Sequence, residues 1–199
     1  MSGLARLIVR ALTGPEIAAA IDDLAALRIA VFAAFPYLYD GDAAYEADYL
    51  REFAAAPGAV LVAAFAGVQI VGAATASPMS AQKAELRAPF EERGIDTARL
   101  FYFGESVLLP EFRGQGVGHG FFDHREAQAR RCGAEAATFA AVIRAADHSA
   151  RPEGYTPLDS FWRGRGYAPV PGLLSEMAWK EHGEAAESPK PMQYWMRSL

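Results

Sequence analysis

The feature that most constrains the fold is an apolar run that ends in a proline and a glycine-rich stretch. Leu100–Leu109 (LFYFGESVLL) is rich in aromatic and aliphatic residues, which favours a strand, and Pro110 ends it because proline cannot donate to a ladder. The stretch RGQGVGHG follows at residues 113–120, and residues 117–132 have a helical pattern. The sequence therefore predicts a strand, then a glycine-rich segment, and then the start of a helix.

Two nucleotide-binding fingerprints do not fit these glycines. The dinucleotide pattern GxGxxG, started at Gly114 or Gly116, requires a third glycine where the chain has His119 or Phe121. A P-loop requires Lys and then Ser or Thr after its last glycine, and neither follows Gly120. What remains is a helix start whose exposed N–H groups, reinforced by about half a positive charge, form a seat for a phosphate or pyrophosphate.

The rest of the chain alternates strands and helices without an internal repeat. We expect strands at 4–12, 59–76 (a hairpin), 136–143, 174–179 and 192–199, and helices at 16–35, 43–56, 80–94 and 158–165. The helix at 80–94 should be disturbed at Pro89. A chain of 199 residues suits one α/β domain, so we expect a single domain over residues 1–199.

Charge and composition narrow the partners. A formal net charge of -5 argues against a nucleic-acid or anionic-membrane surface, so we expect neither partner. No run approaches the ~18 apolar residues of a membrane span, and no signal-peptide pattern opens the sequence. The single Cys132 cannot form an internal disulfide, so we expect a cytoplasmic location. The four histidines lack zinc-site spacing, so no metal is expected.

The segment ESVLLPEFRGQGVGHGFF resembles the acetyl-CoA-binding core of the GNAT superfamily of N-acetyltransferases. Its signature is Arg or Gln, two residues, Gly, one residue, and Gly or Ala, which Arg113, Gly116 and Gly118 match. The order of elements also matches nearly the whole chain, and FWRGRGY at 161–167 resembles a late aromatic segment of the family. The resemblance implies an α/β fold with a mixed, mostly antiparallel central sheet, flanked by helices and splayed at the motif strand.

The same resemblance implies that an acetyl group moves from acetyl-CoA to an amine by direct attack in a ternary complex. The implied coenzyme A-binding residues are Val107, Leu108, Leu109, Arg113, Gly114, Gln115, Gly116, Val117, Gly118, His119 and Gly120. The N–H groups of residues 115–120 would hold the pyrophosphate, and Leu108 and Leu109 would pair with the pantetheine arm as with a neighbouring strand. The Leu109 N–H would stabilise the oxyanion.

The reaction also needs a base, and its acid position is unusual. Deprotonating an amine with a pKa of about 10.4 at pH 7 costs about 4–5 kcal/mol of free energy. The resemblance implies that Glu105 lies where many family members place the glutamate that acts as the base. The alternative is that Glu105 is a strand-edge carboxylate paired with Arg or Lys. The usual acid tyrosine is replaced by Trp162, which has no acidic proton. We take Tyr155 as the acid and expect Tyr167 to pack in the core.

The acceptor region is expected between the first two helices. The segment FPYLYDGDAAYEADYL at 35–50 combines four tyrosines with four acidic residues. The resemblance implies that it lines the acceptor pocket, with Tyr37, Tyr39, Asp40 and Asp42 suited to an ammonium or polyamine. The alternative is a solvated acidic turn with tyrosines packed on the core. The acceptor would be a small-molecule amine, or the N-terminus or a lysine of a peptide or protein.

Other functions and assemblies stay open at this point. Trp162 at the acid position motivates a second function class, a module that binds or senses coenzyme A or acyl-CoA without turnover. The edge of the last strand would suit a homodimer, and a monomer is drawn as easily. Arg125 lies where the motif helix of the family has an apolar residue, and we expect its stem to pack and its head to reach solvent.

Overall fold

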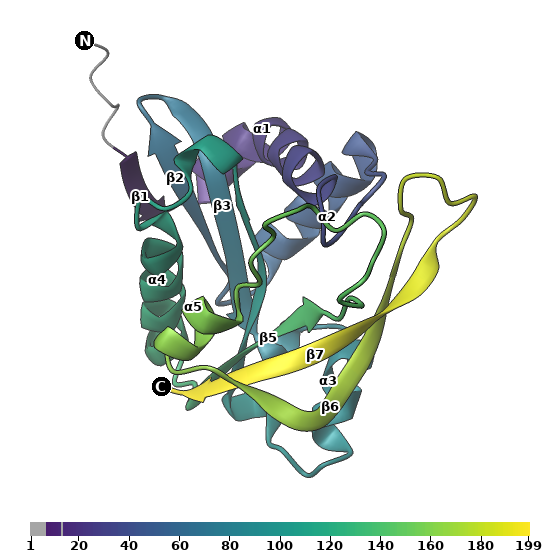
Figure 1. The fold of residues 1–199 in the computed structure, drawn as a ribbon. Helices are drawn as coiled ribbons and strands as arrows, with labels where there is room; N and C mark the ends of the chain where they lie inside the picture. The colour runs from purple at the N-terminus through teal and green to yellow at the C-terminus, as the bar shows by residue number, and fades with distance from the viewer. Residues whose placement is uncertain (1–6, 13) are drawn as a thin grey trace.

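The computed structural model describes residues 7–12 and 14–199, which form strands and helices in alternation (Figure 1). The strands are β1 (Leu7–Ala11), β2 (Val60–Ala66), β3 (Gln69–Pro78), β4 (Leu100–Leu108), β5 (Ala136–Val142), β6 (Ala168–Trp179) and β7 (Ser188–Ser198). The α-helices are α1 (Gly14–Phe32), α2 (Ala43–Ala55), α3 (Ala84–Glu91), α4 (Val117–Arg131) and α5 (Asp159–Gly164). Of the strand expected at 4–12, residues 4–6 lie outside the described part of the chain.

The strands form one sheet in the order β1-β2-β3-β4-β5-β7-β6. Neighbouring strands in this sheet are antiparallel except β4 and β5, which run parallel. This mixed, mostly antiparallel sheet with flanking helices confirms the predicted fold class.

Two helices differ from the expected ranges for reasons of proline chemistry. α1 ends at Phe32 rather than at residue 35, since Phe35 precedes Pro36 and the residue before a proline avoids helical backbone. The helix expected at 80–94 is only Ala84–Glu91, with Pro89 inside it and a 3₁₀ turn at Met79–Ala81 before it. The shortened α1 leaves residues 33–42 free to cross the end of the sheet.

The last two strands are longer than expected. β6 begins at Ala168, and Pro171 and Gly172 lie where its register with β7 shifts, between Pro169 and Leu174. β7 begins at Ser188, and its Pro189 and Pro191 pair in regular register with Ala178 and Glu176, past the end of the pairing between β5 and β7 at Met192. These prolines fit because Pro191 O accepts from Ile143 on the side away from β6, so the missing N–H is not needed for the β6–β7 ladder.

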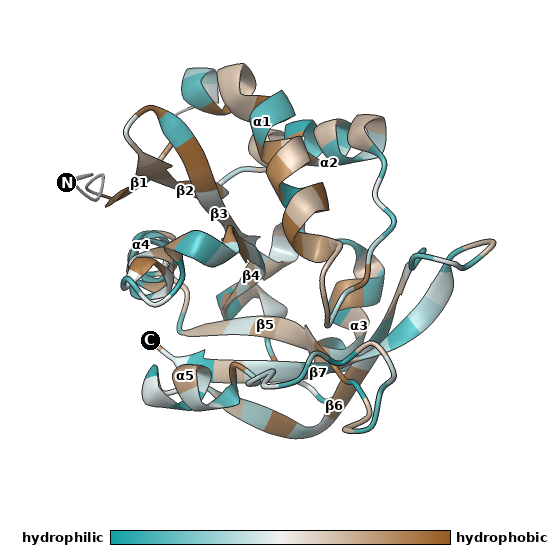
Figure 2. Ribbon diagram, turned by 45° about the horizontal axis from the view of Figure 1, so that its top comes forward, coloured by the Kyte–Doolittle hydropathy of each residue, from teal (hydrophilic) through white to brown (hydrophobic). Residues whose placement is uncertain are grey.

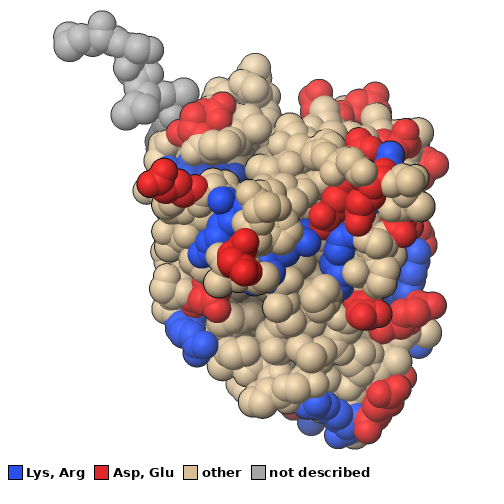
Figure 3. Space-filling view, turned by 45° about the vertical axis from the view of Figure 1, so that its right-hand side comes forward, with Lys and Arg blue, Asp and Glu red and all other residues tan. Residues whose placement is uncertain are grey.

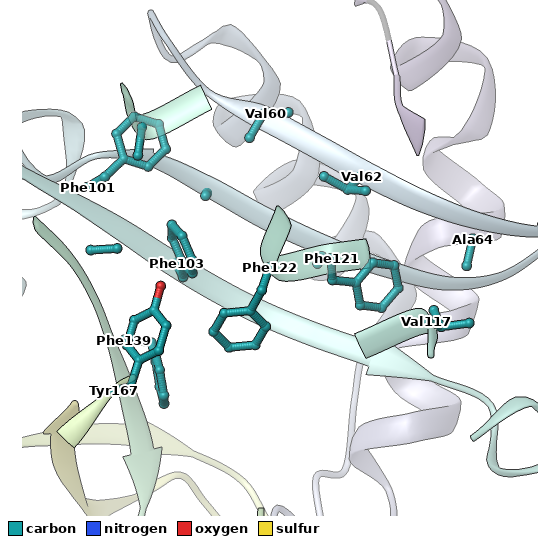
Figure 4. Close-up of a cluster of buried hydrophobic side chains, with 14 of the residues drawn as sticks. Val60, Val62, Ala64, Phe101, Phe103, Val117, Phe121, Phe122, Phe139 and Tyr167 are labelled. Atoms are coloured by element: carbon teal, nitrogen blue, oxygen red, sulfur yellow. The ribbon is translucent and has the colours of Figure 1, made fainter. Parts of the chain in front are cut away.

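Apolar side chains fill both faces of the sheet. Leu61 and Ala63 of β2 pack against α1 and α2 on one face, whereas Val60, Val62 and Ala64 pack against α4 on the other. This alternation follows from the two-residue period of a strand. Figure 4 shows Phe121 and Phe122 of α4 pointing to the sheet, and Figure 2 shows β2 and β3 among the most hydrophobic segments. Helices therefore cover both faces of the central strands, whereas the edge strand β6 is largely exposed.

The described surface shows mixed charge and no membrane-spanning element. On the face drawn in Figure 3, acidic and basic side chains lie near one another among large uncharged areas. None of the helices in the described ranges is long and apolar enough to cross a bilayer.

Candidate active site

The sheet opens between β4 and β5. The two strands pair only over Leu100–Tyr102 and Ala136–Thr138, whereas β4 stays paired with β3 as far as Leu108. Beyond Tyr102, the edge of β4 that faces β5 therefore has no strand partner. Such an edge presents N–H and C=O groups that an extended chain can satisfy.

The free N–H at the end of this edge belongs to Leu108 rather than to Leu109. The Leu109 N–H donates to Val71 O of β3 at 3.0 Å, so it points away from the opening. Successive N–H groups of a strand alternate in direction, which turns those of Leu108 and Ser106 toward the opening. Arg113 Nε donates to Leu108 O at 3.3 Å from this same side. The Leu109 N–H therefore does not face the opening as predicted, whereas the N–H groups of Leu108 and Ser106 do.

Val107 also differs from the prediction. It is fully buried and packs with the core beneath α1 and α2. By the same alternation its N–H faces β3. Of Val107, Leu108 and Leu109, which were predicted to bind coenzyme A, only Leu108 lines the cavity.

The glycine-rich stretch gives α4 an open start. Gly114 and Gly116 have φ of 74° and 82°, and a Cβ on either would meet nothing within 4 Å. In the described residues, no backbone hydrogen bond uses the N–H groups of residues 115–118. His119 and Gly120 instead donate to Gly116 O, at 3.0 and 3.3 Å. The free N–H groups are therefore those of residues 115–118 rather than of 115–120, and they lie at the positive end of a helix.

The other two glycines of the stretch serve packing. A Cβ on Gly118 would lie 3.2 Å from the Phe161 ring, and one on Gly120 would lie 3.1 Å from Val9. Both distances are shorter than a relaxed carbon–carbon contact. Gly118 lets α5 approach α4, and Gly120 lets β1 approach it.

Glu105 is held at an irregular point of β4. The register between β3 and β4 shifts between Ala74 and Ala76, and the Glu105 N–H donates to the Thr75 hydroxyl at 3.3 Å. A Cβ on Gly104 would lie 2.4 Å from that same hydroxyl oxygen, so only glycine fits there. Gly104 and Thr75 together set the position of Glu105 beside the cavity.

The Glu105 carboxylate is ion-paired. It binds Arg28 of α1, which also binds the buried Glu46 of α2, and it accepts a hydrogen bond from Tyr49 Oη at 3.2 Å. Burial disfavours the charge of Arg28, but Glu105, Tyr49 and Glu46 outweigh this and raise the pKa of the guanidinium. The alternative in which Glu105 is a paired carboxylate therefore describes the structure. This cluster of two glutamates and one arginine carries a net negative charge, whereas Arg113 and Arg125 add positive charge to the lining of the cavity.

A cavity of about 600 Å³ occupies the opening between β4 and β5. Its walls include Glu105, Ser106 and Leu108 of β4 and residues of α4 and α5. The segment after α1 and the loop 143–158, drawn in green in Figure 1, complete it. The open strand edge, the carboxylate and the end of the glycine-rich stretch thus meet in one space.

Two tyrosines line this cavity with hydroxyls that take part in none of the hydrogen bonds found in the described residues. Burial raises the pKa of Tyr37 to about 12, with further contributions from Tyr155 and Glu105. Burial also raises the pKa of Tyr155, and Arg113 opposes this. Both phenols are therefore neutral near pH 7 and face the cavity as hydrogen-bond donors.

The two other aromatic residues considered for the acid step behave differently. Tyr167 is buried in the core, with Phe103, Phe122 and Phe139 around it, and donates to Glu126 at 3.2 Å. Trp162 lines the cavity and packs against Phe139 and Trp195. Tyr167 thus packs in the core as expected. Of Tyr155 and Tyr167, the two tyrosines considered for the acid step, only Tyr155 lies at the cavity.

Of the four residues expected to receive the acceptor, only Tyr37 lines the cavity. Asp40 is exposed and pairs with Lys180 at 2.7 Å, which lowers the pKa of its carboxyl. Asp42 caps α2 by accepting from the Tyr45 N–H at 2.8 Å. Burial, together with hydrogen bonding to Glu46, raises the pKa of Tyr39. Contacts within the folded chain therefore account for Tyr39, Asp40 and Asp42, and none of these three lines the cavity.

Arg125 corrects another expectation. Its head does not reach solvent: the residue is 2% exposed, and the guanidinium packs against the rings of both Phe103 and Phe122, 4.5 and 4.7 Å from their centres. Nη1 donates to Thr75 O and Glu105 O at 3.5 and 3.4 Å, where the β3–β4 register shifts. Burial lowers the pKa of Arg125 to about 10. It braces the backbone that carries Glu105.

The sequence analysis missed Arg28 and the aromatic wall at Phe35. Arg28 lies on the polar side of α1, where one arginine among acidic residues gives no signal of a pairing with a strand far along the chain. Phe35 lies three residues after the end of α1 and directly before Pro36, and its side chain lines the cavity. The proline was the available signal.

Comparison with known proteins agrees with this architecture. The profile of the acetyltransferase (GNAT) family matches residues 24–152, and the chain belongs to this family. No curated protein matches the sequence significantly.

Several solved structures share the fold at low sequence identity. A ribosomal-protein-alanine N-acetyltransferase from Brucella melitensis is 13% identical, with a TM-score of 0.63 over 96% of this chain and 99% of that one. yncA from Salmonella typhimurium, solved with its cofactor acetyl-CoA, is 10% identical, with a TM-score of 0.61 over 97% and 94%. An aminoglycoside 6'-acetyltransferase type Ii is 16% identical, with a TM-score of 0.59 over 96% of each chain.

Proposed function

We propose that the chain, as a single domain over residues 1–199, transfers an acetyl group from acetyl-CoA to an amine. The observation that carries this proposal is the meeting of an open strand edge, an open helix start and a carboxylate at one cavity. The family supports acetyl transfer. The fold shared with yncA, whose structure holds acetyl-CoA, supports this donor.

Donor binding would use backbone groups. The free N–H groups of residues 115–118 would hold the pyrophosphate, and Arg113 lies beside them with its guanidinium at Leu108 O. The Leu108 N–H, the nearer of the two to residues 115–118, would pair with a pantetheine amide. The Ser106 N–H, next to Glu105, would stabilise negative charge on the thioester oxygen during attack.

Glu105 would receive the acceptor. An ammonium approaching the carboxylate meets the net negative charge of Glu105, Glu46 and Arg28. Glu105 would hold the amine and take its proton directly or through water, which frees the nitrogen lone pair for attack on the thioester carbon. The new amide bond forms as the carbon–sulfur bond breaks.

Tyr155 would donate a hydrogen bond to the departing sulfur. It lines the cavity, and Arg113 is near enough to affect its pKa. A thiol with an ordinary pKa of about 8.5 is more acidic than either cavity tyrosine, so the thiolate leaves with limited help. Trp162 in place of an acid is compatible with such a reaction.

One observation favours a second function, binding or sensing of coenzyme A without turnover. Both carboxylate oxygens of Glu105 already have partners, Arg28 and Tyr49, before an amine arrives. In this alternative the cavity still binds the donor, but no amine is acetylated.

Turnover separates the two functions. The purified protein is incubated with acetyl-CoA and a panel of amines, and free thiol release and product mass are followed. We expect acetylated amine, and we expect Glu105→Gln to lower kcat by about 10²- to 10⁴-fold while acetyl-CoA binding persists. Glu52→Gln, an exposed glutamate of α2, is the matched control. Donor binding without turnover on any amine, or full activity of Glu105→Gln, would contradict the proposal.

A further inference from the structure

The two ends of the cavity have different walls. The end next to α4 and α5 is built from Leu108, Arg113, Gly118, Phe161 and Trp162 and adjoins the glycine-rich stretch. The opposite end is built from the last turn of α1, the segment after it and the loop 143–158. If the donor enters along the glycine-rich stretch, the second end is left for the acceptor.

The acceptor end is apolar and largely aromatic. Its walls are Val31, Phe32, Phe35, Pro36, Tyr37 and Tyr155. The rings of Phe35 and Tyr155 meet edge to face at 4.7 Å, and those of Phe32 and Tyr37 lie 4.7 Å apart. A ring or short alkyl group placed here would exchange water for apolar contacts.

Among the described residues, Glu105 is the only acidic one that lines the cavity, and Arg113 and Arg125 are the basic ones. The acidic residues nearest in sequence to the aromatic wall are engaged elsewhere, with Asp40 on Lys180, Asp42 at the start of α2 and Asp48 on Arg51. A second ammonium of the acceptor would therefore be buried against aromatic and aliphatic walls without a carboxylate. Burying an unpaired charge is costly.

The loop 143–158 closes the acceptor end from the side. Arg144 Nε donates to Pro36 O at 2.7 Å and Nη2 to Tyr37 O at 3.3 Å. Together with the contact between Phe35 and Tyr155, these bonds fasten the loop to the segment after α1. The cavity of about 600 Å³ must also hold the end of the donor, so the room left suits a small molecule.

We infer that the acceptor is a small amine with a single ammonium group and an apolar body about the size of a phenyl ring. This inference rests on the proposed function and adds the substrate class. Glu105 receives the ammonium, and the wall from Phe32 to Tyr37, with Tyr155, receives the body. Polyamines, which carry several charges, and lysine side chains on a peptide fit this end poorly.

Steady-state assays with matched amines test the inference. The probes are 2-phenylethylamine, spermidine and a lysine-containing peptide, with acetyl-CoA saturating and thiol release as the readout. We expect kcat/KM for 2-phenylethylamine to exceed that for spermidine by about tenfold to hundredfold, the factor that burial of one phenyl-sized group supplies. Equal or better turnover of spermidine or the peptide would overturn the inference and leave the proposed function standing.

Variants locate the specificity on the aromatic wall. Phe35→Ala should raise KM for 2-phenylethylamine about tenfold, with the dissociation constant of acetyl-CoA unchanged, because Phe35 lines only the acceptor end. Tyr45→Ala, which truncates a 62% exposed ring of α2, is the matched control and should change neither value. An unchanged KM in Phe35→Ala would overturn the assignment of this wall.

A binding measurement separates failure of the inference from failure of the proposed function. Binding of 2-phenylethylamine in the presence of coenzyme A is followed by ligand-observed NMR, which needs no turnover. Binding that depends on Phe35 without any acetylation would support the pocket and contradict the enzyme. No binding of 2-phenylethylamine by the wild-type protein would overturn the inference whatever the turnover of other amines.

Discussion

Arg125 is a buried cation whose charge and hydrogen bonds oppose each other in the free energy of unfolding. Its pKa falls from the ordinary 12.5 to about 10, which corresponds to roughly 3 kcal/mol against the charged form. Against this, Thr75 O and Glu105 O would each lose a donor without it, at about 1–3 kcal/mol per group. The two effects are of similar size.

Arg125→Met should therefore change the free energy of unfolding by less than about 1 kcal/mol, because it removes the buried charge and keeps most of the apolar volume. Arg125→Ala should cost about 3 kcal/mol or more, since it also leaves a cavity beside Phe103 and Phe122. Urea unfolding of both variants measures this. Equal destabilisation by Met and Ala would show that the charge itself holds the fold.

Leu108 and Leu109 illustrate what a sequence says about single residues. The strand, its end at Pro110 and the importance of this dipeptide followed from the sequence. The choice between neighbours depends on which N–H points toward β3, and a pairing shifted by one residue reverses it. Only the bond from Leu109 to Val71 fixes that choice.

At the scale of elements, the loop 143–158 is joined to the rest of the cavity mainly through Arg144. This side chain is mostly buried and binds two backbone carbonyls after α1 as well as the carboxylate of Glu181 before β7. It connects β5, the segment after α1 and the β6–β7 hairpin. Its partners Pro36 and Glu181 lie 108 and 37 residues away along the chain, so the sequence gives no signal of this bracing contact.

Arg144→Gln should loosen the acceptor end and leave the donor end intact. We expect KM for a productive amine to rise about three- to tenfold, in line with losing charged hydrogen bonds worth about 1.5–3 kcal/mol to a loop that partly reorders on binding. The dissociation constant of acetyl-CoA should stay within about twofold. Arg51→Gln, an exposed partner of Asp48, serves as control. A selective loss of donor binding would contradict this account.

Elements with regular spacing were predicted well, and those containing prolines were not. α2 lies within one residue of its expected range, because a capping aspartate and an apolar stripe define it locally. The length of the β6–β7 hairpin was missed, since pairing across a register shift between Pro169 and Leu174 gives no local signal in the sequence. Long-range pairing decided these strands.

At the scale of the whole molecule, the acidic balance of the chain does not collect in the cavity. Acidic and basic groups lie close together on the face in Figure 3. In the segment that follows α1, Asp40 and Asp48 form ion pairs and Asp42 caps α2. The sequence showed that tyrosines and carboxylates cluster at 35–50, but composition alone does not say which of them face inward. The sequence predicted the region of the site from the strand and the glycine-rich stretch. It did not show which N–H groups and which side chains face the cavity.

Titration of acetyl-CoA into wild type, Gly116→Val and Gly67→Val by calorimetry tests the central claim, that the open start of α4 holds the donor. Gly67, in the β2–β3 turn, is a matched control: its φ of 62° is also positive and its Cβ would also meet open space. Both substitutions carry similar backbone strain. We predict that Gly116→Val weakens binding at least about 100-fold, whereas Gly67→Val binds as wild type does. Equal affinity in all three proteins would contradict the account.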